Sequence, residues 1–289
     1  MGGKAFDDTK PVARDRIIPI IEWYLKALGG FRFTTLGSTG KKDMSGDIDL
    51  AVQSINGFTF DFGALSGFAH EAALRVMVLK LEKILGVDNV KPNIRFSQIY
   101  TRWHDPQGGD PVQVDFMLGD MALLAFTHWS PEPHTSQYSG AHRTEYLKAV
   151  AKSLSRVESV DGRVVARVGY TLHHDRGLEY SPRWCKPRQD GEGYTVKMVK
   201  VSDADIELFE ATFPLLVSKK ESHGFTTDPR IICERLFDTG VTPDMVNSYE
   251  QIADLVKNSH HLYINRDLIW QLYVERLVEI KQPIPKRFV

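Results

Sequence analysis

Two aspartates separated by one apolar residue are the first feature of the sequence that suggests chemistry. Asp47 and Asp49 flank Ile48 in the run DIDLAV. In a β-strand, side chains at positions i and i+2 point to the same face, and their α-carbons are about 6.6 Å apart. Ile48 would then face a core while both carboxylates face one point. Such a pair is suited to holding a divalent cation.

A third acid, Asp115, alternates with apolar neighbours in the run VQVDFML. If this run is a strand beside DIDL, three anionic groups come together, and their repulsion raises their proton affinity unless a cation compensates. Ligands that offer only oxygen favour Mg²⁺ or Mn²⁺ over zinc. Two such ions about 3.5 to 4 Å apart would stabilise the attacking and leaving oxygens of a displacement at phosphorus. We therefore expect two ions at Asp47, Asp49 and Asp115.

The alternatives to this metal site are structural. Asp47 and Asp49 would bind no metal ion if they lay on a solvent-facing strand edge. Asp115 would likewise bind none at an ordinary surface position. Asp110 and Asp120, in the flanking loops, are the alternatives to Asp115 as the third acid.

A Gly-Ser turn precedes the aspartate pair, with Gly37 ten residues before Asp47. Glycine lets the main chain approach a phosphate closely, and the Ser38 hydroxyl and nearby N–H groups can hydrogen-bond it. Lys41 or Lys42 can neutralise its charge. The sequence predicts a triphosphate site at this turn, beside the metal site.

These residues form a pattern of apolar-Gly-Ser, a short variable stretch, Asp-apolar-Asp-apolar, and a later strand Asp. In this chain the pattern is Leu36-Gly37-Ser38, Asp47-Ile48-Asp49-Leu50 and Val114-Asp115-Phe116. It resembles the DNA polymerase β-like nucleotidyltransferase superfamily, which includes CCA-adding enzymes, poly(A) polymerases and oligoadenylate synthetases. The resemblance covers roughly a third of the chain, so it specifies a catalytic core and not an acceptor.

The resemblance implies roles for five residues. Asp47 and Asp49 would bind both metal ions, and Asp115 would bind the catalytic ion and help to deprotonate an acceptor hydroxyl. Ser38 would contact the β- and γ-phosphates, and Gly46 matches a glycine that precedes the aspartate pair in the polymerase branch. The implied reaction is attack of the acceptor hydroxyl on the α-phosphate of a nucleoside triphosphate, with release of pyrophosphate.

Several cationic and histidine side chains farther along the chain are candidates for nucleotide contacts. Arg143 and Lys148, in HRTEYLKAVAK, would reach the triphosphate from a helix, although a solvated helix face explains them equally well. His128, His134 and His142 line a proline-rich loop and would contact a base or phosphate, or only solvent. No zinc-ligand spacing links them.

A second acidic pair, Asp203 and Asp205, follows Ser202 and precedes an amphipathic run. No Gly-Ser turn lies upstream of it. This context predicts the acidic first turn of a helix, where carboxylates interact favourably with the helix dipole, and not a second metal site.

The distribution of charge bears on the acceptor. The chain has a net charge of -1, which excludes a uniformly basic surface, yet residues 141–200 hold 12 Lys/Arg and 7 Asp/Glu, a net +5 that leaves -6 elsewhere. Within this segment Tyr180, Arg183, Trp184, Lys186 and Arg188 combine aromatic and basic groups that suit base stacking and phosphate contacts, or else form an exposed hairpin rim.

An RNA 3′ end, for example that of a tRNA, is therefore the leading acceptor hypothesis. A protein or small-molecule acceptor is the alternative within the same reaction class. A catalytically idle nucleotide-binding or regulatory module is the alternative of a different class.

The composition is that of an ordinary globular protein, with 42% hydrophobic and 25% charged residues in 289. Cys185 and Cys233 have no spacing typical of a disulfide framework or structural zinc site, which indicates reduced thiols. The N-terminus lacks an apolar signal core, and no apolar run reaches the roughly 18 to 20 residues that span a bilayer. We expect a cytoplasmic protein with no membrane partner.

The elements that must position the candidate site follow from periodicity. Helices are expected at 16–28, 68–85, 143–154, 203–217, 228–237, 244–257 and 265–280, and strands at 31–37, 47–52, 94–103, 112–118, 163–170 and 194–201. The predicted fold is α/β (α+β): a mixed-sheet nucleotidyltransferase core with helices over residues 1–155, then a small β element and a helical C-terminal region over residues 156–289.

Overall fold

The two strands predicted to carry the acids lie side by side in the centre of a mixed sheet. In the computed structural model, which describes residues 5–55, 58–59, 67–160, 164–187, 194–195 and 224–287, β4 (Ile48–Ile55) pairs in parallel with β8 (Val112–Met117). The strand order is β2 (Phe31–Thr35), β4, β8, β7 (Gln98–Trp103) and β6 (Val90–Asn93). The other pairings are antiparallel, and β5 (Phe58–Thr59) pairs with the end of β4. The predicted mixed sheet with helices is confirmed.

One face of this sheet is buried under two helices. The helices are α1 (Arg14–Leu28) and α2 (Gly67–Leu85), and the core between them and the sheet includes Ile48, Leu50, Val114 and Phe116. A hydrogen-bonded chain crosses this core: the Tyr24 hydroxyl contacts Thr101 Oγ1 at 2.8 Å, and Thr101 Oγ1 donates to the Val114 carbonyl at 2.9 Å. Because side chains alternate along a strand, Asp49 and Asp115 emerge on the other face.

Short elements hold the segment that leads into β4. β1 (Val12–Ala13) pairs with β3 (Met44–Ser45), and the Arg14 N–H donates to the Asp43 carbonyl. The start of α1 therefore fixes the chain immediately before Gly46 and Asp47.

On the open face, α3 (Met121–Thr127) packs through Leu124 against Ala51 and Met117. The helix begins after Asp120, whose carboxylate accepts the Leu123 N–H at 2.8 Å. Asp120, one of the two alternatives to Asp115 as the third acid, is thus a helix cap. The other alternative, Asp110, is exposed in the β7–β8 loop.

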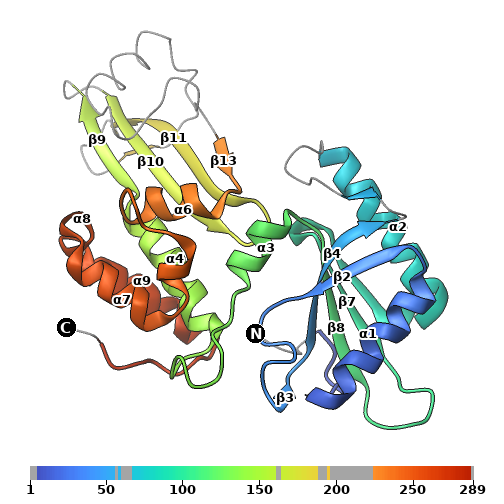
Figure 1. Ribbon diagram of the computed structural model, residues 1–289. Helices are drawn as coiled ribbons and strands as arrows, with labels where there is room; N and C mark the ends of the chain where they lie inside the picture. Colours follow the sequence, from blue (N-terminus) through green and yellow to red (C-terminus); the bar gives the residue numbers. More distant parts are fainter. Residues whose placement is uncertain are drawn as a thin grey trace.

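A second sheet and the remaining helices form the other lobe in Figure 1, with α3 between the lobes. The sheet order is β12 (Tyr194–Thr195), β11 (Gly177–Pro187), β10 (Val164–His173) and β9 (Arg156–Val160), and β13 (Gly224–Thr226) also pairs with β11. Around it lie α4 (Gly140–Ser153), α6 (Pro229–Leu236), α7 (Tyr249–Asn258), α8 (His260–Tyr263) and α9 (Arg266–Glu279). This β element and helical C-terminal region match the predicted order.

The two hydrophobic cores divide the chain at α3. The first core ends at Leu118, whereas the second includes Leu123 and Phe126 of α3 and Leu147 of α4. The domain boundary at residue 155 stays a prediction, and α4 itself packs with the C-terminal elements. Among the residues that the structure describes, no helix combines the length and apolar character needed to cross a membrane.

Most predicted elements agree with the structure to within a few residues, and two differ. The strand expected at 94–103 begins as a 3-10 turn, η2 (Ile94–Phe96), and its regular part starts after Ser97, which has a φ of 54°. The helix expected at 244–257 is divided into η3 (Pro243–Val246) and α7, because Ser248 caps α7 by accepting the Gln251 N–H. A third 3-10 turn, η1 (Val87–Asn89), follows α2. The expected helix 203–217 and most of the expected strand 194–201 lie outside the described residues.

Arg143 is buried in the second core, which corrects its predicted contact with a triphosphate. Its Nε donates to the Val246 carbonyl at 2.6 Å and its Nη1 to the Phe126 carbonyl at 2.7 Å. The guanidinium lies over the Phe126 ring at 4.7 Å, and burial lowers the pKa of Arg143 to about 10. Arg143 therefore joins α3, α4 and η3, and its side chain is fully buried.

Replacement of Arg143 by alanine is expected to lower the free energy of unfolding by roughly 2 to 5 kcal/mol, because two buried carbonyls lose their donors and a cavity remains. Urea unfolding at pH 7 measures the change. Lys152→Ala, at an exposed position of the same helix, should stay within about 0.5 kcal/mol of wild type. Equal stability of the two variants would contradict the structural role of Arg143.

Candidate metal and nucleotide site

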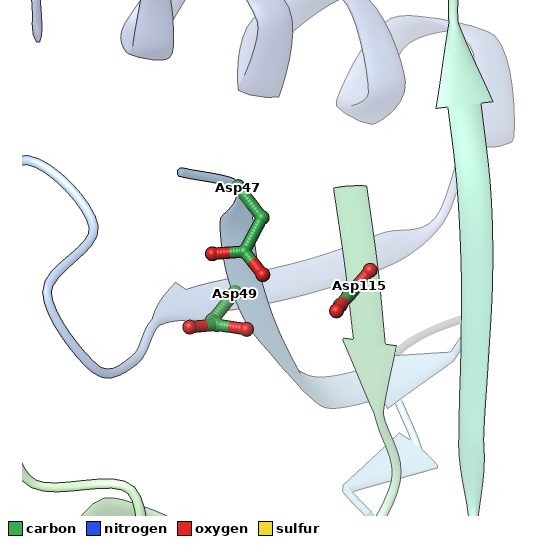
Figure 2. A group of neighbouring side chains, drawn as sticks. All are labelled: Asp47, Asp49 and Asp115. Carbon is green, nitrogen blue, oxygen red and sulfur yellow. The ribbon is translucent and has the colours of Figure 1, made fainter. Parts of the chain in front are cut away.

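Asp47, Asp49 and Asp115 come together on the open face of the first sheet (Figure 2). Each offers a carboxylate oxygen, and these oxygens lie within 4.8 Å of one another. Asp47 immediately precedes β4, and Asp49 is directly opposite Asp115 in the parallel β4–β8 register. Among the described residues this is the only group of three or more His, Cys, Asp or Glu side chains with metal-ligand spacing.

The carboxylates repel one another and are poorly hydrated. Loss of hydration, followed by the charges of Asp47 and Asp115, holds the pKa of Asp49 well above its usual range. Burial and the Asp47 charge raise the pKa of Asp115 to about 8, against a hydrogen bond from Gln113 that lowers it. A divalent cation would remove the repulsion, and an all-carboxylate donor set fits Mg²⁺ or Mn²⁺.

The Gly-Ser turn passes directly over Asp49. Gly37 has a φ of 63°, and a Cβ added to it would lie 2.8 Å from Asp49 Oδ2, so only glycine fits this position. The Leu36 N–H donates to the Asp49 carbonyl, and the Asp49 N–H donates to Thr39 Oγ1, both at 2.9 Å. Thr39, which is buried, thus connects the turn to β4. Nothing in the local sequence pattern singled it out.

The rest of the turn is fixed through Ser38. Its carbonyl accepts the Lys41 N–H at 3.0 Å and the Ser45 hydroxyl at 3.4 Å, while its side chain is partly exposed. Lys42 and Gly46 are exposed on the same segment. Contacts of Ser38, Lys42 and Gly46 with phosphate stay predictions.

Lys41 is engaged with the loop that follows α3. Its ammonium donates to the Ser130 carbonyl at 2.6 Å, lies 3.2 Å from Glu132 Oε1, and stands 4.3 Å from the centre of the Trp129 ring. The main chain of Trp129 forms a β-bridge with Gly37. The loop 129–132 therefore runs beside the turn, although the two are far apart in the sequence.

Gln113 orients Asp115. Its side-chain amide donates to both Asp115 oxygens, at 2.8 and 3.1 Å, and its Oε1 accepts the Ala5 N–H at 3.0 Å. Gln113 is buried and two residues before Asp115, on the same face of β8. That i−2 spacing was the signal available in the sequence.

Tyr100 lies next to the acids on β7, which pairs with β8 on the side away from β4. It is directly opposite Asp115 in the antiparallel β7–β8 pair. Its hydroxyl donates to Gln98 Oε1 at 2.6 Å. Loss of hydration, and then the charges of Asp115 and Asp49, raise the pKa of Tyr100.

The other predicted contact residues are dispersed. Lys148 pairs with buried Glu145 at 2.8 Å within α4, so any contact with a nucleotide stays a prediction. His142 is buried in the second core with its Nδ1 2.7 Å from the Tyr273 hydroxyl, so neither the expected base or phosphate contact nor the solvated alternative agrees with the structure. His134 is exposed. His128 ends α3, and burial with the neighbouring His174 lowers its pKa to about 3.

The aromatic and basic residues predicted to contact nucleic acid lie largely outside the part of the structure whose side chains are described. Tyr180, Arg183, Trp184 and Lys186 belong to β11, but their side chains are outside the described part of the structure. Arg188 and the acidic pair at 203 and 205 also lie outside the described residues.

Comparisons with known proteins show similarity to DNA polymerase β structures. No protein-family model matches the sequence, and no curated protein matches it. The chain is similar to *Leishmania infantum* polymerase beta in a ternary P/T complex, with 12% identity, a TM-score of 0.40 and coverage of 82% of this chain and 77% of that one. For the ternary gap complex of that polymerase the values are 11%, 0.41, 82% and 71%.

Because the pKa of Asp115 is raised, ionisation of its carboxyl group should lower the free energy of unfolding of the metal-free protein. Because the pKa of about 8 in the folded protein exceeds the ordinary aspartate pKa of 3.8, wild type should lose stability relative to Asp115→Asn as the pH rises from about 4 through about 8. Chemical unfolding in EDTA across this range measures the difference, and Mg²⁺ at high pH should stabilise wild type more than the variant. Asp110→Asn serves as the exposed control. A difference that does not change with pH would refute the assignment.

Removal of the Gln113 amide is expected to weaken metal binding, since Asp115 loses the donor that fixes both of its oxygens. Gln113→Ala should bind Mn²⁺ about 10- to 100-fold more weakly than wild type in calorimetric titration. Gln53→Ala, an exposed position on β4, is the matched control and should bind as wild type does. Unchanged Mn²⁺ affinity in Gln113→Ala would rule out this positioning role.

Proposed function

We propose that this protein is a metal-dependent nucleotidyltransferase, which transfers a nucleoside monophosphate from a triphosphate to an acceptor hydroxyl and releases pyrophosphate. One observation carries the proposal: three carboxylates, on two adjacent parallel strands or immediately before one, lie beside a glycine turn that leaves no room for a Cβ next to the Asp49 carboxylate. A site that only binds a nucleotide does not need three carboxylates, because they repel a triphosphate unless metal ions are present.

Asp47, Asp49 and Asp115 would hold Mg²⁺ or Mn²⁺, and the pattern of the sequence favours two ions. When bound, such ions would offset the charge of the triphosphate and stabilise the attacking and leaving oxygens. The fit rests on the oxygen-only donor set and on the raised pKa values of Asp49 and Asp115.

The order of strands supports separate positions for the two proposed substrates. The Gly37 turn leaves β2, on one side of β4, whereas Asp115 lies in β8, on the other side. The triphosphate would therefore bind toward β2, with the Ser38 hydroxyl and the N–H groups of the turn directed at its phosphates. The acceptor hydroxyl would approach from the side of Asp115 and Tyr100, where the Asp115 carboxylate would help to remove its proton.

An RNA 3′ end, such as that of a tRNA, is the acceptor we favour. The support is the net charge of +5 over residues 141–200, the segment that contains α4 and the long strands β10 and β11. A protein or small-molecule acceptor is the second candidate, and the overall charge of -1 is compatible with it.

Loss of the Asp47 or the Asp49 carboxylate should abolish transfer of the nucleoside monophosphate. With Mg²⁺, labelled triphosphates and a mixture of RNA, protein and small-molecule acceptors, Asp47→Asn and Asp49→Asn are expected to be at least about 100-fold slower than wild type. Asp43→Asn, exposed shortly before the pair, should keep wild-type activity. Pyrophosphate release and the identity of the labelled acceptor are the two measurements.

Three outcomes separate the alternatives. Label on RNA supports the favoured acceptor, and label on a protein or small molecule supports the second candidate. Nucleotide binding with neither label nor pyrophosphate, in wild type as in the variants, would replace the enzyme by a nucleotide-binding or regulatory module.

A further inference from the structure

The ammonium group of Lys41 is paired with a carboxylate of the same protein. Lys41 lies in the turn proposed to bind the triphosphate, yet its charge is paired with Glu132 at 3.2 Å and lies over the ring of Trp129 at 4.3 Å. A hydrogen bond to the Ser130 carbonyl at 2.6 Å completes the contact. The turn thus carries its own carboxylate counter-ion, supplied by the loop after α3.

The three partners of Lys41 differ in how easily they can be replaced. The Ser130 carbonyl and the Trp129 ring belong to a fixed part of the loop: Trp129 bridges to Gly37, and a Cβ on Gly140 would lie 2.6 Å from the Trp129 carbonyl oxygen. The Glu132 side chain is 58% exposed, whereas that of Lys41 is 23% exposed. Only the carboxylate can therefore leave at little cost, since an exposed ion pair is weak.

We propose that Glu132 occupies the place of a phosphate group on Lys41, and that a bound triphosphate displaces it. This inference rests on the proposed function. A phosphate group of the nucleotide would then lie beside the Lys41 ammonium, at the position that the Glu132 carboxylate occupies. Glu132 acts as a determinant of specificity, because a ligand must bring enough negative charge to Lys41 to replace the carboxylate.

Two consequences distinguish this arrangement from a simple surface ion pair. Removal of the Glu132 charge should strengthen binding of a triphosphate, since the competing carboxylate and its repulsion are lost. A nucleoside monophosphate, which lacks the β- and γ-phosphates, should gain nothing. Trp129, which is 36% exposed, should also report the event, because its fluorescence depends on the cation over its ring.

The test is a cycle of variants titrated with ATP and with AMP in the presence of Ca²⁺, followed by calorimetry and by tryptophan fluorescence. Glu132→Gln should bind ATP about two- to five-fold more tightly than wild type and AMP equally. Lys41→Met should weaken ATP binding and abolish the gain from Glu132→Gln in the double variant. Lys41→Arg should retain that gain, and Glu234→Gln, exposed on α6, should have no effect.

Tryptophan fluorescence tests whether the displacement of Glu132 takes place beside Trp129. ATP should change the emission of wild type, and Trp129→Phe should lose that change while keeping its fold by circular dichroism. An unchanged ATP affinity in Glu132→Gln, a gain that persists without Lys41, or an equal gain for AMP would each overturn the inference. If wild type nevertheless releases pyrophosphate, the proposed function stands without it. If wild type binds no ATP and releases no pyrophosphate, both fail.

Discussion

Mutual repulsion among three carboxylates is the constraint on which the rest of the first lobe depends. Asp47, Asp49 and Asp115 are held within 4.8 Å although this raises the pKa of Asp49 and Asp115. The free energy that keeps them together comes from the opposite face of the same strands, where Ile48, Leu50, Val114 and Phe116 are buried under α1 and α2. Separating the acids would require the parallel strands to separate, and with them this core.

The second lobe contributes to the site by fixing one loop. Arg143 and the core around it hold α3 against α4, and the chain between these helices carries Trp129 and Glu132 to the Gly37 turn. Gly140 permits this path, because a side chain there would collide with the main chain of Trp129. The surroundings of the turn are consequently built from both lobes.

Three of the cations predicted to contact the triphosphate differ in how easily their partners can be exchanged. Arg143 is bound to buried carbonyls, and Lys148 is paired with buried Glu145, which also binds Arg276 at 3.1 Å. Lys41 alone of the three has a largely exposed carboxylate as its partner. A ligand phosphate can replace such a carboxylate more easily than it can extract a buried charge, because the exposed one regains its hydration on release.

Local periodicity in the sequence was enough to predict which side chains of the site share a face. The alternation in DIDLAV and VQVDFML specified which side chains share a face, and the glycine of LGS specified a turn that the main chain could bring close to a carboxylate. The hydrogen-bond partners of other residues in and around the site depend on the tertiary structure. Lys41 meets a carbonyl 89 positions away, Gln113 meets Ala5 across 108, and Arg143 meets Val246 across 103. These contacts depend on how sheets and helices pack, which no periodicity records, so a buried arginine and a solvated one have the same appearance in the sequence.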